Sequence, residues 1–377
     1  MIMLVRRMSA RLHVLPLVSK RWARVIKASA EVWERACLEL TDITTLDPDG
    51  ELGNLDCAAM AAWFHARPGR IEELGLRCLD RTLQLPAAVT SMVLSTQTAS
   101  LKRLSIDVGA YSLSGPELGV IVAVRGLEAL DIRVDRHGFA DRGAAVIRTA
   151  SRLTGLTRLD VTYAVEPGER VAGRHSEGVS LPRCQELAKL RSRSLTWLSM
   201  VLDSGSEETA LQLTGLPNLQ HCHLLADGSS TECAITSTSF ADCTRLEDLS
   251  LHRQAGLVLQ PGCFSALSAL TSLTLTECDV QRMPPVIVGP TSLRRLDLSR
   301  NKNLLINKPG IDLLRRLKEL RVLNVAHSEP RVQDSYHAQL LFALAQDVRD
   351  AGMRLDVTFR DEQSDTYQPE TEYFGTG

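Results

Sequence analysis

Two histidines flank a cysteine at His221-Cys222-His223, and a further cysteine, Cys233, follows ten residues later. Imidazole nitrogens and thiolate sulfurs are ligands that zinc prefers in proteins. In an extended strand, however, successive side chains point to opposite faces, so His221 and His223 share one face while Cys222 points away from it. These side chains therefore cannot converge on one ion. We expect no metal site and no cofactor, and we interpret His221 and His223 as solvent-facing polar residues, with two exposed histidines as metal ligands the alternative interpretation.

The common short motifs of catalytic sites are missing from the chain. It has no Gly-x-x-x-x-Gly-Lys phosphate loop, no Gly-x-Ser-x-Gly turn and no His-Glu-x-x-His helix. Scattered Ser, His and Asp residues could still form a site, but no pattern in the sequence indicates one. We therefore expect a protein that is not an enzyme and has no catalytic residue.

The composition narrows the class of partner and the compartment. The net charge of the chain is −2, whereas general nucleic-acid and membrane binders depend on a strong positive field. No apolar run approaches the length of about 18 residues that suggests a membrane span. The nine cysteines are an odd number without paired spacing, which favours reduced thiols in the cytoplasm or nucleus. We expect no nucleic-acid and no membrane partner.

A short phrase, apolar-x-x-apolar-x-apolar, recurs along most of the chain and must position these side chains. The copies lie 23 to 39 residues apart and begin at Ile71, Leu101, Leu127, Leu156, Leu195, Leu219, Leu246, Leu270, Leu293 and Leu320. The clearest copy, from Leu293 to Asn301, resembles the leucine-rich repeat pattern as far as its asparagine. That resemblance implies an α/β solenoid of about ten repeats over residues 71–328, a horseshoe with a parallel sheet on its concave face.

The segments between the phrases should return the chain along the convex side. Helical spacing predicts helices over residues 116–125, 142–153, 183–189 and 311–320, and the Pro- and Gly-rich stretch 260–290 predicts shorter arcs. The widest gap contains the polar, Gly-rich residues 164–180, which we interpret as an exposed insertion, with a degenerate repeat as the rival interpretation. Residues 329–359 predict a capping helix and a final strand, and residues 360–377 a disordered acidic tail.

The N-terminal segment carries a second resemblance. Residues 17–25, Leu-Val-Ser-Lys-Arg-Trp-Ala-Arg-Val, and the pair Val32-Trp33 resemble the second half of an F-box, followed by a short strand that enters the repeats. We assign residues 1–40 to a helical partial F-box and residues 41–70 to a helical linker or cap. The opening Leu-Pro-x-x-Leu-Leu helix of that family is absent. The resemblance implies that Leu17, Val18, Trp22 and Trp33 contact a Skp-type adaptor of a cullin ubiquitin ligase.

Other interpretations of this segment remain open. Residues 1–30 contain seven Lys or Arg and no acidic residue, as an organelle transit peptide does. An amphipathic capping helix with a basic face is a plainer possibility. The whole chain could accordingly be a substrate receptor of a Skp–cullin–F-box ligase, or an interaction scaffold of the cytoskeletal, ciliary or organelle-targeted kind.

Strand alternation identifies the positions that would face a protein substrate. Residues that flank the buried leucines point to the concave face, and aromatic, Arg and His residues gather in the middle of the array. The predicted partner-binding residues are Arg133, Arg158, Asp160, Tyr163, Trp197, Val201, His221, His223, Leu225 and His252. Aromatic and arginine anchors among polar neighbours are typical of protein-binding hot spots, so the sequence predicts a binding patch around Trp197.

Overall fold

The computed structural model describes residues 35–39, 71–77, 100–107, 115–134, 143–163, 182–202, 209–226, 233–254, 256–326, 339, 342–346 and 356–358. The chain divides into two compact units, unit 1 from Met1 to Pro182 and unit 2 from Arg183 to Gly377. The division falls in the widest gap between phrases, which begin at Leu156 and Leu195.

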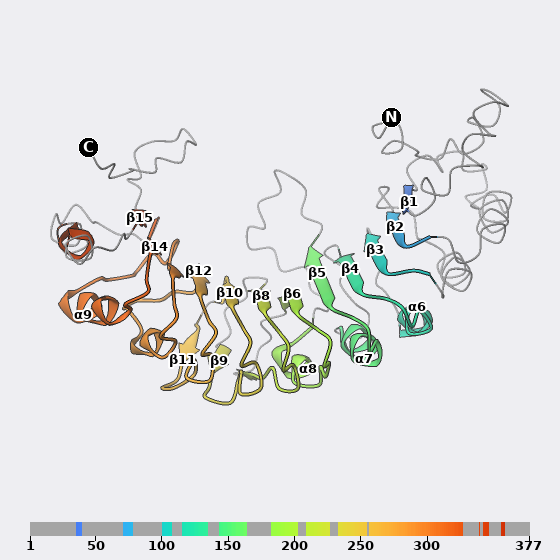
Figure 1. Cartoon of the computed structure of the whole chain (residues 1–377), viewed down its shortest axis with the longest axis horizontal. Helices are drawn as coiled ribbons and strands as arrows, with labels where there is room; N and C mark the ends of the chain where they lie inside the picture. The colour runs from blue at the N-terminus through green and yellow to red at the C-terminus, as the bar shows by residue number, and fades with distance from the viewer. Residues whose placement is uncertain are drawn as a thin grey trace, which may run out of the picture. The chain divides into compact units, whose positions relative to one another are not determined.

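Unit 1 is built on parallel strands that run side by side (Figure 1). They are β1 (Arg35–Glu39), β2 (Glu73–Arg77), β3 (Arg103–Asp107), β4 (Ala129–Val134) and β5 (Arg158–Tyr163). Equivalent positions of successive phrases pair across the strands, so Leu74 lies beside Leu104 and Leu104 beside Leu130. All three leucines are at most 2% exposed. Each repeat therefore buries its leucines against the next one, as a solenoid requires.

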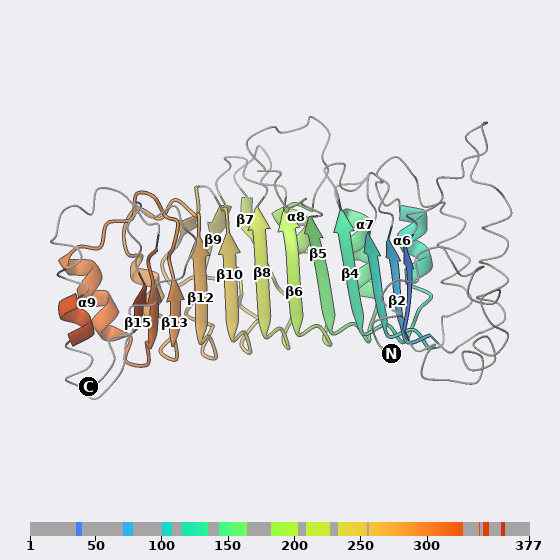
Figure 2. The ribbon, with the colours of Figure 1, turned by 90° about the horizontal axis from the view of Figure 1, so that it is seen from above.

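Unit 2 continues the same construction, and its strands also run parallel (Figure 2). They are β6 (Trp197–Leu202), β8 (His221–Ala226), β10 (Asp248–His252), β12 (Ser272–Thr276), β13 (Arg295–Asp297), β14 (Val322–Asn324) and β15 (Asp356–Thr358). In both units every phrase bears a strand that begins two residues after its first apolar residue. The predicted parallel strands and the final strand of the cap are confirmed.

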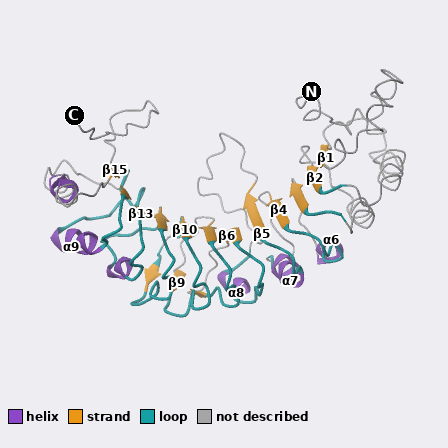
Figure 3. Ribbon diagram, in the orientation of Figure 1, coloured by secondary structure: helices purple, strands orange, loops and turns teal. Residues whose placement is uncertain are grey.

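Helices lie on one side of the strands in each unit (Figure 3). They are α6 (Gly115–Ile121) and α7 (Ala144–Arg152) in unit 1, and α8 (Cys184–Leu187) and α9 (Lys308–Arg316) in unit 2. The four predicted return helices are confirmed, each with slightly different ends. The arc predicted to be less helical contains the short 3₁₀ helix η3 (Pro285–Val288).

The start of α9 shows how the sequence sets a helix boundary. The Asn307 side chain accepts a hydrogen bond from the Gly310 backbone N–H at 3.1 Å, which satisfies one of the unpaired donors of the first turn. Pro309 occupies that same turn, where a missing N–H costs least. Arg315 and Arg316 lie in the last turn, where positively charged side chains interact favourably with the helix dipole.

A small second sheet in unit 2 was not predicted from the sequence. It pairs β7 (Thr209–Leu211), β9 (Cys233–Ile235) and β11 (Val258–Leu259), all parallel. The Ser239 hydroxyl donates a hydrogen bond to the Leu211 carbonyl of β7, with 2.5 Å between the two oxygens. Three successive return segments are therefore joined by strand pairing, where unit 1 uses helices.

The cysteines whose side chains the structure describes are all buried, and none of them forms a disulfide. Cys222 and Cys278 are at most 1% exposed, so they fill core positions as small apolar residues do. Burial raises the pKa of the Cys243, Cys263 and Cys278 thiols to about 12. The thiol form therefore predominates at neutral pH, and these residues serve packing.

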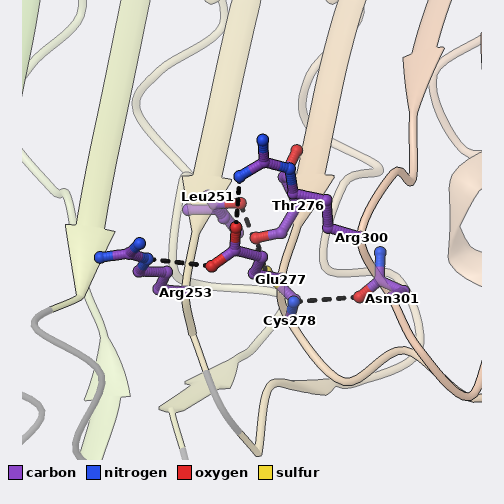
Figure 4. A network of polar contacts seen from close by, with 7 residues as sticks. All are labelled: Leu251, Arg253, Thr276, Glu277, Cys278, Arg300 and Asn301. Atoms are coloured by element: carbon purple, nitrogen blue, oxygen red, sulfur yellow. Dashed lines mark hydrogen bonds and ion pairs between the residues drawn. The ribbon is translucent and has the colours of Figure 1, made fainter. Parts of the chain in front are cut away.

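Asn301 forms the hydrogen-bond centre of the turn that follows the clearest phrase (Figure 4). Its Oδ1 accepts hydrogen bonds from the backbone N–H groups of Cys278 and Val280, at 3.0 and 3.1 Å. Its Nδ2 donates to the Leu275 and Leu298 carbonyls, both at 2.7 Å. Cys278 holds the same position one repeat earlier and donates its S–H to the Leu251 carbonyl at 3.3 Å. The turn position thus links neighbouring repeats through buried backbone groups.

The residue before this turn position adopts the left-handed conformation in three successive repeats. Arg253, Glu277 and Arg300 have φ angles of 56°, 57° and 59°. Glu277 lies between the two arginines, 2.9 Å from Arg253 Nε and 2.9 Å from Arg300 Nη1 (Figure 4). Left-handed backbone costs a non-glycine residue roughly 1 kcal/mol, so the surrounding contacts must hold all three in place.

Several predicted segments fall on residues whose structure is not described. They are the F-box-like residues Leu17, Val18, Trp22 and Trp33, the linker 41–70, the insertion 164–180 and the tail 360–377. Of the predicted C-terminal helix, residues 342–346 are described and are helical. None of the described helices is both long enough and apolar enough to cross a membrane.

Candidate functional site

The open face of unit 2, meaning the side of its strands that carries Trp197, His221, His223 and Asp248, presents an aromatic and polar cluster. Trp197 on β6 pairs in register with His221 on β8. The Trp197 ring centroid lies 4.9 Å from that of His221 and 4.9 Å from that of His223, stacked on the latter at 19°. All three side chains are partly exposed, while Cys222 between the histidines is fully buried. The structure therefore brings these three of the predicted residues into contact.

Asp248 on β10 completes the cluster from the other side of β8. Its Oδ2 lies 3.3 Å from His223 Nε2 and 3.9 Å from His221 Nδ1. Among the described residues, both of these ring nitrogens are covered from solvent and make no hydrogen bond of good geometry, and His221 Nδ1 is too far from the carboxylate for one. The ligand-type atoms of these three residues all lie within 4.8 Å of one another, so this arrangement could hold a metal ion.

The environment of Asp248 favours its charged form. Partial burial raises the pKa of this carboxyl, but contacts from His223 and Ser272 and the nearby imidazoles outweigh burial, so the pKa is lower than usual. The side chain is therefore an ionised carboxylate at neutral pH.

Val201 corrects the predicted patch. Alternation along β6 places it on the same side as Trp197, but the side chain is 2% exposed and offers no surface to a partner. Strand alternation determines the face to which a side chain points, whereas its exposure to solvent depends on how neighbouring segments pack. Leu225, its partner in register, is partly exposed, and so is His252. Burial lowers the pKa of His252, which favours a neutral imidazole.

Three of the predicted residues of unit 1, Arg133, Arg158 and Asp160, are charged. Arg158 Nη2 lies 3.1 Å from Asp160 Oδ2, and Asp160 pairs in register with Asp131. Burial raises the pKa of Asp131, while the neighbouring Arg133 opposes this rise. Arg133 and Arg158 are exposed. Tyr163 ends β5, and its side chain is not among those described.

Asp248 was missed as a site residue because it is remote in sequence from the histidines. A signal did exist, since each phrase places one residue at the start of its strand. His221 and Asp248 both hold that position in adjacent repeats and pair in register. Counting phrase positions across neighbouring repeats, instead of searching along the chain, would have found it.

Within each unit, the repeated phrase, the parallel strands in register and the return segments on one side define the fold of a leucine-rich repeat solenoid. No protein-family model and no curated protein sequence matches the chain. This class rests on the geometry of the repeats themselves.

Solved structures that resemble the chain do so at low identity. The crystal structure of the TLR13–ssRNA13 complex is 15% identical, with a TM-score of 0.35, over 79% of this chain and 51% of that one. The crystal structure of the mouse RP105/MD-1 complex is 19% identical, with a TM-score of 0.42, and the match covers 70% of this chain and 47% of that one. The leucine-rich repeat-containing protein LegL7 from Legionella pneumophila is 13% identical, with a TM-score of 0.41, and the match covers 86% of this chain and 91% of that one. The chain thus spans about half the length of the first two.

Proposed function

We propose that this protein binds a protein partner through the open face of unit 2, with Trp197 as the anchor. The single observation that carries the proposal is the packing of Trp197 against His221 and His223, with the indole partly exposed. Aromatic side chains that are already held in place lose little conformational freedom on binding.

The charge of this face supports a protein partner over a nucleic acid. The cluster around Trp197 contains the ionised Asp248 and no Lys or Arg, so it would repel a phosphate backbone. Mixed polar groups around an aromatic centre are typical of protein–protein interfaces.

The finer proposal is a substrate receptor of a Skp–cullin–F-box ubiquitin ligase, acting in the cytoplasm or nucleus. Its support is the resemblance of residues 17–40 to half of an F-box, placed ahead of the repeats. In such a receptor Leu17, Val18, Trp22 and Trp33 contact the Skp adaptor, and the repeats hold the substrate. Ubiquitin transfer belongs to other subunits of such ligases, so the role asks for binding and not for a catalytic group.

The partner-binding test uses affinity purification of the full chain from its own organism, followed by mass spectrometry. Trp197→Ala should lower the affinity for the recovered partner about tenfold or more, because truncating an aromatic anchor commonly costs over 1.4 kcal/mol of binding free energy. Leu305→Ala is the matched control, since Leu305 is an exposed apolar residue (43%) elsewhere in unit 2. Equal losses for the two variants, or none for Trp197→Ala, would refute the proposed anchor.

A separate arm of the same purification tests the ligase role. A receptor should retain a Skp-type adaptor, and Val18→Asp should release it while the Trp197-dependent partner stays bound. If no adaptor is recovered with the unaltered chain, the interaction scaffold becomes the better account.

A further inference from the structure

The cluster His221, His223 and Asp248 has the composition and spacing of a three-ligand metal site. The two histidines come from one strand, two residues apart, and therefore project from the same face. Asp248 comes from the adjacent parallel strand, so the backbone hydrogen bonds between β8 and β10 fix its distance from them. Three side chains on two rigid, paired strands provide a preorganised site.

The observed distances fit a small divalent ion. Zinc binds imidazole nitrogen and carboxylate oxygen at about 2.0–2.2 Å, so two ligand atoms of a tetrahedral site lie about 3.3–3.5 Å apart. His223 Nε2 and Asp248 Oδ2 are 3.3 Å apart, and His221 Nδ1 is 3.9 Å from the same oxygen. All three ligand atoms lie within 4.8 Å of one another, so the side chains have to rotate closer together to reach the spacing of a tetrahedral site.

The polar bonding of these residues also indicates a ligand. The two ring nitrogens that face Asp248 are covered and make no hydrogen bond of good geometry with any residue that the structure describes. Such groups are rare in native proteins and commonly mark a bound water or ion. Ser272 hydrogen-bonds Asp248 and Trp197 packs on both imidazoles, so outer contacts orient the ligand groups as they do in zinc sites.

We propose that His221, His223 and Asp248 bind Zn²⁺ on the open face of unit 2, with the fourth coordination position open to solvent. Two imidazoles select zinc over magnesium and calcium, which prefer oxygen ligands throughout. Cys222 takes no part, because its side chain is buried on the other face of β8. The expectation of no metal site considered Cys222 and Cys233 as the additional ligands and overlooked the carboxylate on the next strand.

Calorimetric titration of the full chain with zinc chloride, after chelator treatment and dialysis, tests this site. We expect one zinc ion per chain that depends on this cluster. His223→Ala and Asp248→Asn should each lower the affinity about tenfold or more, since even outer-shell changes cost zinc sites that much. His252→Ala is the control, because His252 lies on β10, is partly exposed and is outside the cluster.

Cobalt absorption spectroscopy separates this site from zinc held by thiols elsewhere in the chain. Co²⁺ at the cluster should give visible bands without the intense near-ultraviolet absorption of a cobalt–thiolate bond. Circular dichroism of each variant checks that the fold is kept, and His221→Gln replaces any variant that fails to fold. Absence of zinc binding, affinity unchanged in both ligand variants, or a thiolate spectrum that those variants leave intact would overturn the proposal.

Discussion

Asn301 shows how much one buried side chain can do in a repeat protein. It is fully buried, and its side chain pairs with two backbone N–H groups and with the Leu275 and Leu298 carbonyls. Cys278, one repeat earlier, bonds the Leu251 and Thr276 carbonyls through its sulfur. The same repeat position is thus satisfied by different chemistry, and the asparagine supplies the stronger hydrogen bonds.

Asn301→Ala should lower the free energy of unfolding by about 2–4 kcal/mol, because it leaves several buried backbone groups unsatisfied. Urea denaturation followed by circular dichroism measures this loss. Asn303→Ala is the control, since Asn303 is exposed and its amide donates a hydrogen bond to the Asp279 carboxylate. A loss no greater for Asn301→Ala than for Asn303→Ala would contradict the role assigned to the buried amide.

Single residues also mark the limit of prediction from sequence. The phrase correctly placed Trp197, His221 and His223 on one face, because strand alternation depends only on local backbone geometry. It failed for Val201, whose burial depends on segments that pack over it. It also failed for Asp248, whose proximity depends on pairing between repeats.

At the scale of elements, a line of ion pairs joins the ends of three neighbouring strands. Glu277 follows β12 and contacts Arg253 after β10 and Arg300, which follows the phrase of β13. Partial burial raises the pKa of Glu277, but the hydrogen bonds from Arg300 and Arg253 lower it by a larger amount. The pKa is therefore below the usual 4.5. The folded chain therefore binds this proton less readily than the unfolded chain does.

This pKa shift makes the contribution of Glu277 depend on pH. A lowered folded-state pKa gives stability that is fully present above the unfolded value and is lost as the pH falls through the folded value. Glu277→Gln should therefore lower stability by about 0.5–1 kcal/mol at pH 7, the scale of exposed ion pairs, and the difference should fade below pH 4.5. Urea midpoints of both proteins between pH 7 and pH 3 measure the difference. A difference that is constant with pH would assign the effect to packing.

The elements themselves divide into those that a pattern predicts and those that it does not. The ten phrase strands and four return helices were predictable, since periodic apolar residues and capping residues are local signals. The sheet of β7, β9 and β11 was not, because its strands are two or three residues long. Such strands exist through contacts with equivalent segments of neighbouring repeats, which no single window of sequence contains.

At the scale of the whole molecule, stability should be local along each stack of repeats. A repeat contacts its neighbours and little else, so damage to one strand should spread only a short way. Leu249, fully buried on β10, packs beside Cys222 on β8 and Leu273 on β12. The division into two units, which the sequence did not predict, adds a further boundary to such spreading.

Leu249→Ala should cost about 2–5 kcal/mol through the cavity that it leaves. Hydrogen exchange measured by mass spectrometry should show lost protection in β8, β10 and β12, with β2 to β4 of unit 1 unchanged. Val258→Ala, at a partly exposed apolar site (40%), should leave the exchange of all these strands as it was. Uniform loss across both units in Leu249→Ala would indicate a single cooperative structure.

The small sheet of β7, β9 and β11 has a consequence for local curvature. Neighbouring strands lie about 4.8 Å apart, whereas packed helices need about 8–10 Å. Where α6 packs on α7 in unit 1, the return side requires a wider spacing than the strand side, a mismatch that favours a bent stack. Where β7, β9 and β11 pair in unit 2, both sides share the same spacing, which favours a flatter stretch beneath Trp197 and the histidines. The return segments, remote from any ligand, thus set how flat a surface the binding face can offer.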